Sequence, residues 1–179
     1  MAFIEIGFNT KRPLILGRGG FGTQLNDWLM DEGWGSADFL DDNAPDAVGG
    51  LRDYVDPAIL KRGRPAFGAL GDNKLRVELL QKLAAAGYST PVFISDAASV
   101  SPSAVLEPGC IILPQAYVGA DAHLGVGCIV NAGAIVDHNA HLGRGVHVAP
   151  GGIVKASAEV ADFGKVDSGE IVRSPWENQ

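Results

Sequence analysis

The sequence has few cysteines, few aromatic residues and no long hydrophobic run. Its two cysteines cannot build the dense disulfide framework of a small secreted domain, so a reducing cytoplasm is the expected location. No stretch of about 18 apolar residues occurs, so a membrane-spanning helix is not expected. The first residues lack a basic segment followed by an apolar run, so a secretory signal is not expected either.

Basic residues are also in the minority, since 14 Lys and Arg stand against 21 Asp and Glu and give a formal net charge of −7. An acidic surface of this kind disfavours nucleic acids and anionic membranes as partners. It does not exclude an anionic small molecule, because one pocket can differ from the average surface. Glycine, in contrast, occurs 24 times, and this composition favours narrow, repetitive β structure over a helical bundle.

A six-residue repeat runs through the second half of the chain. An aliphatic residue returns at every sixth position, and a small residue stands two places before nearly all of them. The aliphatic series is Ile94, Val100, Leu106, Ile112, Val118, Leu124, Val130, Val136, Leu142, Val148, Val154, Val160, Val166 and Val172. This period fits neither an α-helix nor an alternating strand. It predicts a three-sided β-solenoid with aliphatic side chains inside, and another β-solenoid or a β-sandwich is the competing interpretation.

The first half predicts a small α/β domain with a parallel sheet, because short apolar strands alternate with helices. The expected strands are 14–16, 38–43 and 66–70, with a fourth at 91–94 leading into the solenoid, and the expected helices are 23–32 and 75–86. The domain is too short for a full dinucleotide fold. A mononucleotide or a sugar nucleotide suits its size better.

A glycine-rich turn follows the first strand and opens the first helix. Such a turn lets backbone N–H groups approach a phosphate at a helix N-terminus, although a tight turn without a ligand is the alternative. Two acids end the second strand, where acids often bind a ribose or a base edge. The candidate residues for a nucleotide are Gly17, Gly19, Gly20, Phe21, Gly22, Asp41 and Asp42.

Four sets of residues together carry a resemblance to a known family. They are residues 14–17 with the glycine-rich turn, residues 39–42, residues 71–73 with Arg76, and residues 131–139 followed by 145–151. Over about residues 13–157 the sequence resembles the hexapeptide-repeat acetyltransferases of the sialic-acid O-acetyltransferase and UDP-4-amino-sugar N-acetyltransferase (NeuD/PglD) family.

The resemblance implies both an architecture and an activity. It implies a Rossmann-like α/β nucleotide-sugar-binding domain over residues 11–93, a left-handed parallel β-helix over residues 94–173, and a tail over residues 174–179. It also implies a homotrimer that moves an acetyl group from acetyl-CoA, bound between neighbouring subunits, to an amino or hydroxyl group of a nucleotide-linked sugar. The same base serves both acceptors, so N- and O-acetylation stay open, including O-acetylation of a sialic-acid-like substrate.

The resemblance also assigns roles to residues. His138 is the implied general base, flanked by Asp137 and Asn139, and histidine suits this role because its ordinary pKa lies near neutral pH. A backbone N–H near Ala156 is the implied donor to the oxyanion of the attacked thioester. The other implied contacts are His147 and Gly151 for acetyl-CoA and Asn73 for the nucleotide sugar.

Two departures from the family leave an alternative open. Many relatives carry an acid where this chain has Asn139, and an amide cannot stabilise an imidazolium by charge. The regular repeat also weakens at Glu170, earlier than in many relatives. A catalytically weak or inactive trimeric binding or structural subunit of the same fold is therefore the second hypothesis.

A metal is not expected to be required. His123 and His141 are eighteen residues apart and should stack on one face of the solenoid, which invites comparison with a zinc site. The comparison is with the γ-class carbonic anhydrases, but those need three histidines across a subunit boundary at a different spacing, and the motif around His138 is not theirs. Surface histidines are therefore the expectation.

Overall fold

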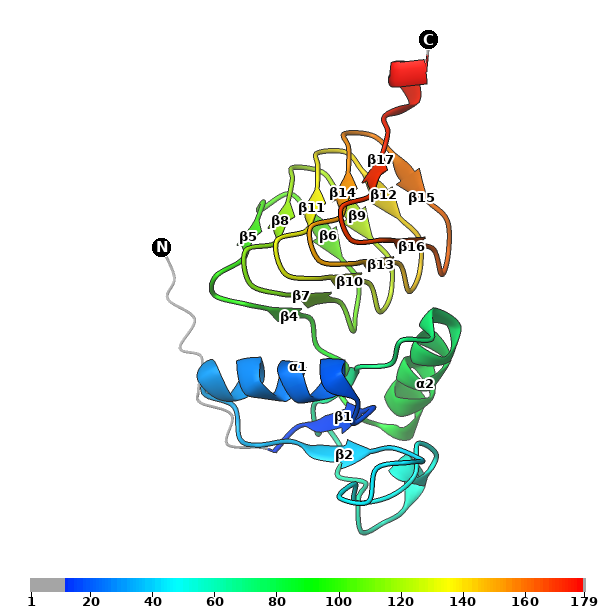
Figure 1. Cartoon of the computed structure of the whole chain (residues 1–179). Coiled ribbons are helices and arrows are strands. Elements are labelled where there is room, and N and C mark those ends of the chain that lie inside the picture. The colour runs from blue at the N-terminus through cyan, green and yellow to red at the C-terminus, as the bar shows by residue number, and fades with distance from the viewer. Residues whose placement is uncertain (1–11, 179) are drawn as a thin grey trace. The chain divides into compact units, whose positions relative to one another are not determined.

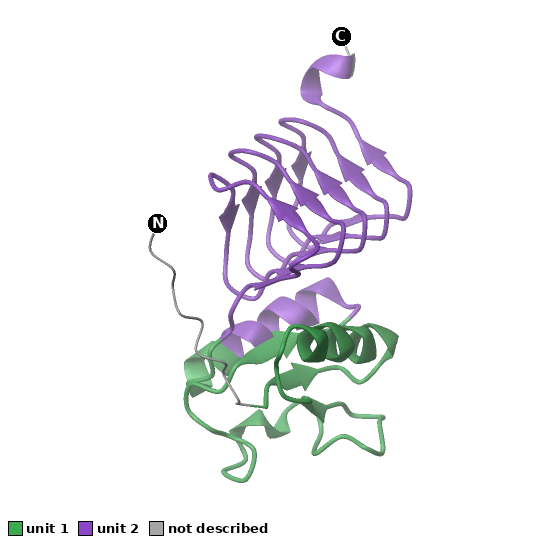
Figure 2. Cartoon of the chain, turned by 90° about the vertical axis from the view of Figure 1, so that its left-hand side faces the viewer, with its two compact units in different colours: residues 1–70, 83–89 green, residues 71–82, 90–179 purple. Residues whose placement is uncertain are grey.

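A computed structural model describes residues 12–178 of the chain. The chain divides into two compact units (Figure 2). The first comprises the chain up to Leu70 together with Leu83–Ser89, and the second comprises Gly71–Lys82 and the chain from Thr90. Helix α2 (Asn73–Ala86) therefore contributes to both units. None of the described helices is long and apolar enough to cross a membrane.

The first unit contains a three-stranded parallel sheet with helices. Its strands are β1 (Leu14–Leu16), β2 (Asp38–Leu40) and β3 (Ala66–Gly68), in the order β2-β1-β3, and they are accompanied by α1 (Gly20–Asp31) and the 3-10 helix η1 (Asp53–Val55). All three residues of β1 are fully buried, as expected of the central strand of a parallel sheet. The expected fourth strand does not join this sheet, because Phe93–Ile94 pairs with the solenoid strand β7 instead.

The second unit is a parallel β-solenoid built from two-residue strands (Figure 1). They form three sheets in the orders β16-β13-β10-β7-β4, β17-β14-β11-β8-β5 and β15-β12-β9-β6. The strands are β4 (Phe93–Ile94), β5 (Ser99–Val100), β6 (Val105–Leu106), β7 (Ile111–Ile112), β8 (Tyr117–Val118), β9 (His123–Leu124), β10 (Ile129–Val130), β11 (Ile135–Val136), β12 (His141–Leu142), β13 (His147–Val148), β14 (Ile153–Val154), β15 (Glu159–Val160), β16 (Lys165–Val166) and β17 (Ile171–Val172). The 3-10 helix η2 (Pro175–Asn178) follows.

The repeat works as the sequence predicted from β5 onward, because the second residue of each of these strands points inward. Together with the small residues two places earlier, these aliphatic side chains form one continuous core. Ile94, the first residue of the predicted series, is instead 41% exposed. Every sixth residue from Gly109 to Gly169 has a positive φ, which turns the chain at each edge of the prism. The three edges pass through Gly109, Gly127, Gly145 and Phe163 (edge A), through Gln115, Gly133, Gly151 and Gly169 (edge B), and through Asp121, Asn139 and Ser157 (edge C).

The N-terminal part of α2 packs along edge A. A Cβ on Gly127 would lie 2.8 Å from Cδ1 of Leu80, and one on Gly145 would lie 2.7 Å from Cγ2 of Val77. The buried Arg76 donates through Nε to the carbonyl of Gly127 at 2.9 Å and through Nη2 to that of Gly145 at 2.6 Å. The close approach of α2 therefore leaves no room for a Cβ at Gly127 or Gly145.

Candidate active site

His138 lies in the turn after β11, on edge C. Its side chain is exposed, and its backbone N–H donates to Oδ1 of Asp137 at 2.7 Å. Its ring atom Nδ1 lies 2.9 Å from Oδ1 of Asn139, which has φ 58°. An amide oxygen can only accept, so Nδ1 carries the proton and Nε2 of the neutral ring is left with its lone pair. The three predicted catalytic residues, which are consecutive in the chain, share this turn, and the side chains of His138 and Asn139 are hydrogen-bonded to each other.

The equivalent positions of successive coils stack above His138. Ala156 and Ser174 lie one and two coils further on, and hydrogen bonds join each of these coils to the one before it. The N–H of Ser157 donates to the carbonyl of His138 at 3.0 Å, and Oγ of Ser174 donates to the carbonyl of Ala156 at 2.8 Å. Within residues 12–178 the N–H of Ala156 has no hydrogen-bond acceptor. The predicted oxyanion donor therefore lies one strand spacing, about 4.8 Å, from the coil of the base.

His147 lies on β13, outside edge C. Its Nε2 is 3.3 Å from Nδ2 of the buried Asn131, whose Oδ1 accepts the N–H of Ala132 at 2.8 Å. Burial, with the positive charges of Arg76 and Lys165, lowers the pKa of His147 to about 4, so the ring is neutral at pH 7. No role was predicted for Asn131, although its place directly after β10, the strand that pairs with β13, could have indicated one.

The predicted base His138 and the predicted acetyl-CoA contact His147 lie on different sides of the prism. The turn of His138 joins the sheet of β11 to the sheet of β12, whereas His147 belongs to the third sheet, which faces that edge across the core. The predicted cofactor contact Gly151 lies on edge B, just after β13, with φ 67° and no atom within 4 Å of the place of a Cβ. One protomer therefore does not bring His147 and Gly151 to the His138 edge.

The glycine-rich turn of the first unit contains two kinds of glycine. A Cβ on Gly22 would lie 2.0 Å from the carbonyl oxygen of Gly17, and one on Gly17 would lie 2.7 Å from that of Ala69. These two glycines permit close packing. Gly19 and Gly20, in contrast, are exposed and have open space around them. Helix α1 begins here with no side-chain cap and no acid in its first turn, so its N-terminus favours an anion.

Asp41, directly after β2, accepts hydrogen bonds from backbone N–H groups. Its carboxylate accepts the N–H of Arg18 at 2.8 Å, of Asn43 at 2.8 Å and of Ala44 at 3.1 Å. These hydrogen bonds, that from Arg18 first, lower the pKa of Asp41. Asp42 accepts the N–H of Leu51 at 2.8 Å. Both acids thus shape the loop beside the glycine-rich turn.

Arg18 was not among the predicted ligands, although it lies inside the glycine-rich turn. Its guanidinium stands 4.5 Å from the ring centre of Phe39 and pairs with Asp46 at 3.0 Å. Its Nη1 donates to Oγ1 of Thr23 at 2.6 Å. The structure therefore places a cation next to Gly19 and Gly20, and a cation within a glycine-rich turn was the available signal.

Asn73, predicted to contact the nucleotide sugar, lies in the second unit. Its Nδ2 donates to the carbonyls of Phe163 at 2.9 Å and Gly164 at 3.0 Å. The side-chain amide of Asn73 therefore holds α2 on edge A. Phe21, another predicted contact, lies in the first turn of α1.

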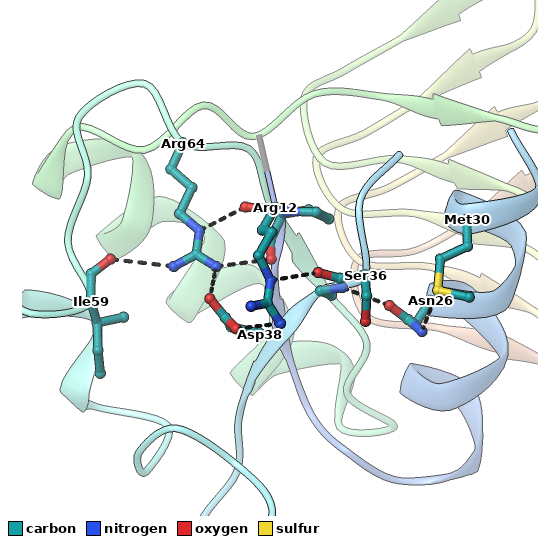
Figure 3. Close-up of polar contacts among 9 residues, drawn as sticks. Arg12, Asn26, Met30, Ser36, Asp38, Ile59 and Arg64 are labelled. Carbon is teal, nitrogen blue, oxygen red and sulfur yellow. Dashed lines mark hydrogen bonds and ion pairs between the residues drawn. The ribbon is translucent and has the colours of Figure 1, made fainter. Parts of the chain in front are cut away.

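A second polar cluster of the first unit is structural (Figure 3). The buried Arg64 donates to the carbonyls of Arg12 at 2.9 Å and Pro13 at 3.1 Å and pairs with Asp38 at 2.5 Å, while Arg12 pairs with Asp38 at 3.1 Å. This cluster binds the amino ends of β1 and β2, and ligands of parallel sheets bind at the carboxyl ends.

The expected stacking of two histidines is confirmed on the sheet β15-β12-β9-β6. The rings of His123 and His141 are 4.8 Å apart and 5° from parallel. His123 Nε2 lies 3.3 Å from Oε1 of Glu107. Across residues 12–178 no group of three or more His, Cys, Asp and Glu residues is arranged to hold a metal ion.

The chain is similar to solved acetyltransferase structures, although no family model and no curated protein matches its sequence. The acetyltransferase domain of PglB from Neisseria gonorrhoeae FA1090, in complex with acetyl coenzyme A, is 28% identical, with a TM-score of 0.83 over 92% of this chain and 83% of that chain.

Two structures from Caulobacter crescentus are similar as well, both in complex with CoA and GDP-perosamine. A histidine-to-asparagine mutant of perosamine N-acetyltransferase is 28% identical, with a TM-score of 0.80 over 86% of this chain and 76% of that chain. PerB is 26% identical, with a TM-score of 0.68 over 90% of this chain and 91% of that chain. The hexapeptide-repeat acetyltransferase fold is thus common to this chain and these enzymes.

Proposed function

We propose that this protein is an acetyltransferase that moves the acetyl group of acetyl-CoA to an amino or hydroxyl group of a nucleotide-linked sugar. The observation that carries the proposal is the pairing, in adjacent coils, of the oriented base His138 with the unbonded N–H of Ala156. The similar enzymes of known structure are bound to acetyl coenzyme A or to CoA and GDP-perosamine. They support acetyl transfer with acetyl-CoA as the donor and a nucleotide-linked sugar as the acceptor.

The proposed chemistry uses Nε2 of His138 and the N–H of Ala156. Nε2 takes a proton from the acceptor amine or hydroxyl as the acceptor attacks the thioester carbonyl, and a positioned base of this kind contributes roughly 10²–10⁴-fold. The N–H of Ala156 donates to the oxyanion, and collapse of the tetrahedral intermediate releases the CoA thiolate. Asn139 keeps the proton on Nδ1, so that Nε2 faces the acceptor as a base.

The nucleotide sugar is proposed to bind the first unit. Gly19 and Gly20 allow a phosphate to approach the uncapped N-terminus of α1, and Arg18 adds a positive charge there. The other predicted glycines, Gly17 and Gly22, support the turn through packing.

A homotrimer is proposed because the site of a single protomer is incomplete. The sheet that contains β11 carries an exposed apolar stripe, in which Tyr117, Ile135 and Ile171 are 42%, 36% and 45% exposed. Contiguous exposed apolar side chains mark protein interfaces. This stripe lies between edges B and C, so a second copy packed on it would lie next to the turn of His138.

We also assign the chain to the NeuD/PglD family, with a left-handed coil and with domain limits at residues 11–93 and 94–173 and a tail at 174–179. The supporting features are the matching segments, the hexapeptide solenoid and the three-stranded parallel sheet that precedes it. The exposed turn of His138 is where the family places its base.

The direct test measures acetyl-CoA consumption with a panel of UDP- and GDP-linked amino sugars. We expect turnover with at least one acceptor, and we expect His138→Ala to abolish it without changing the assembly. His141→Ala is the matched control, because His141 is also exposed but lies on strand β12, where its ring stacks on His123. Activity retained in His138→Ala would remove this residue from its role. Lack of turnover with every amino sugar and hydroxyl acceptor would favour a binding or structural subunit.

A further inference from the structure

Two turns of edge C are joined to the preceding coil by the same backbone hydrogen bond. In each of them the residue with positive φ donates its N–H to the carbonyl nineteen residues earlier. Asn139 donates to Ala120 at 2.9 Å, and Ser157 donates to His138 at 3.0 Å. The turn of His138 is therefore held by the coil that follows it.

Ser174 supplies the next bond of this series in a different way. The next carbonyl is that of Ala156, and the residue nineteen places after it is Pro175, which has no N–H to donate. Oγ of the buried Ser174 donates to this carbonyl at 2.8 Å instead. Pro175 then begins the 3-10 helix η2 (Figure 1). The hydroxyl of Ser174 thus takes over the role that a backbone N–H has in the two preceding turns.

The carbonyl that Ser174 holds belongs to the residue of the proposed oxyanion donor. Within residues 12–178 the N–H of Ala156 has no acceptor, so the bonds on either side of it set its direction. On one side, the carbonyl of Lys155 accepts the N–H of Ala158 at 3.0 Å. On the other side, the carbonyl of Ala156 itself accepts the hydroxyl of Ser174. Ser174 therefore supplies one of the two bonds that fix this residue.

An ion pair joins the same turn to the same C-terminal segment. The carboxylate of Glu177, on η2, lies 2.6 Å from Nζ of Lys155, the residue directly before Ala156. Both partners are partly exposed, and such pairs are worth little. The hydrogen bond of Ser174 is buried, and a buried carbonyl that loses its donor is costly. Of the two contacts, the hydroxyl of Ser174 should therefore dominate.

We infer that Ser174 is a positioning residue, which orients the N–H of Ala156 towards the oxyanion of the attacked thioester. The inference rests on the proposed function and adds to it a residue that acts through Ala156. An oxyanion donor is effective because its direction is set before the reaction begins. Loss of the hydroxyl frees the turn to rotate, so it should lower kcat and leave the affinity for acetyl-CoA unchanged.

The test compares the steady-state kinetics of the unmodified chain, Ser174→Ala and Ser174→Thr, with acetyl-CoA as the donor and the acceptor that the unmodified chain uses. Removal of an oxyanion donor costs about 10²–10³-fold in kcat, and we expect its loosening in Ser174→Ala to cost about ten-fold. The KM for acetyl-CoA should stay the same. The acid limb of kcat/KM should also stay in place, because His138 keeps its hydrogen bond to Asn139. Ser174→Thr retains a hydroxyl and should recover most of the turnover.

Ser103→Ala is the matched control, since Oγ of Ser103 also binds a turn of edge C, where it accepts the N–H of Asp121 at 3.1 Å. It should keep the kcat of the unmodified chain. Circular dichroism gives the folded fraction, and each rate is divided by it, so that a loss of stability alone does not lower kcat.

Three results would overturn the inference and leave the proposed function standing. They are an unchanged kcat in Ser174→Ala, an equal loss in Ser103→Ala, and a folded Ser174→Thr that recovers no turnover. An unmodified chain that transfers no acetyl group to any acceptor would overturn both.

Discussion

Replacing Asn139 by aspartate tests how this site orients and charges its base. Oδ1 of Asn139 lies 2.9 Å from Nδ1 of His138, so aspartate at the same place keeps the hydrogen bond and adds a negative charge. A carboxylate favours the protonated imidazolium. The acid limb of kcat/KM should therefore move to higher pH in Asn139→Asp, because the base is lost to protonation at a higher pH than in the unmodified enzyme.

The size of this shift in the acid limb follows from the exposure of His138 and Asn139. Exposed ion pairs are worth roughly 0.2–1 kcal/mol, and about 1.4 kcal/mol corresponds to one pH unit. The expected displacement is therefore roughly 0.1–0.7 pH unit, and it should shrink as salt is raised. Above the acid limb, kcat should rise several-fold, since the imidazolium that forms during acyl transfer gains a counter-charge.

The assay follows CoA release against pH with the acceptor that the unmodified enzyme uses. Gln115→Glu is the control, because it adds one negative charge at a positive-φ turn of edge B, away from His138. It should leave the acid limb in place. Asn139→Ala should lower kcat, since the ring is no longer fixed. An acid limb unmoved in Asn139→Asp, with folding intact, would refute the role of the Asn139–His138 hydrogen bond.

Three other changes have definite expected outcomes. Ile135→Asp places a charge in the apolar stripe and should convert trimers to monomers in sedimentation, whereas Val105→Asp on another sheet should not; an unchanged trimer would move the interface elsewhere. Arg76→Met leaves two buried carbonyls without donors and should lower the urea-derived free energy of unfolding by about 2–4 kcal/mol; a loss under about 1 kcal/mol would contradict this. His147 resists protonation when folded, with a pKa of about 4 against 6.5, so the melting temperature should fall between pH 6.5 and 4 more steeply than in His147→Gln; parallel curves would argue against a buried neutral ring.

The solenoid could be predicted because its period is a local property of the chain. Six residues make one face of the prism and the turn to the next face. An inward side chain such as Val136 must therefore recur at every sixth position. The exposure of His138 followed from the same count. The stacking of His123 on His141 did as well, since residues eighteen apart occupy equivalent places in successive coils.

Long-range packing was harder to anticipate. Helix α1 begins at Gly20 rather than Thr23, because Gly22 packs on the carbonyl of Gly17 and is part of the first turn. The amide of Asn73, a predicted ligand of the nucleotide sugar, donates to carbonyls 90 and 91 residues away, and the sequence does not indicate these bonds. No local pattern reports such partners.

The sequence by itself determined the prism, the place of each inward side chain and the turn that exposes His138, because these depend on a repeat only six residues long. The tertiary structure decided what surrounds that turn. It leaves the N–H of Ala156 without a hydrogen-bond acceptor among the described residues, directs Oγ of Ser174 to the carbonyl of Ala156, and buries Arg76 against two edge carbonyls. These relations depend on how coils and a helix meet in space, and a residue's neighbours along the chain carry no information about such meetings.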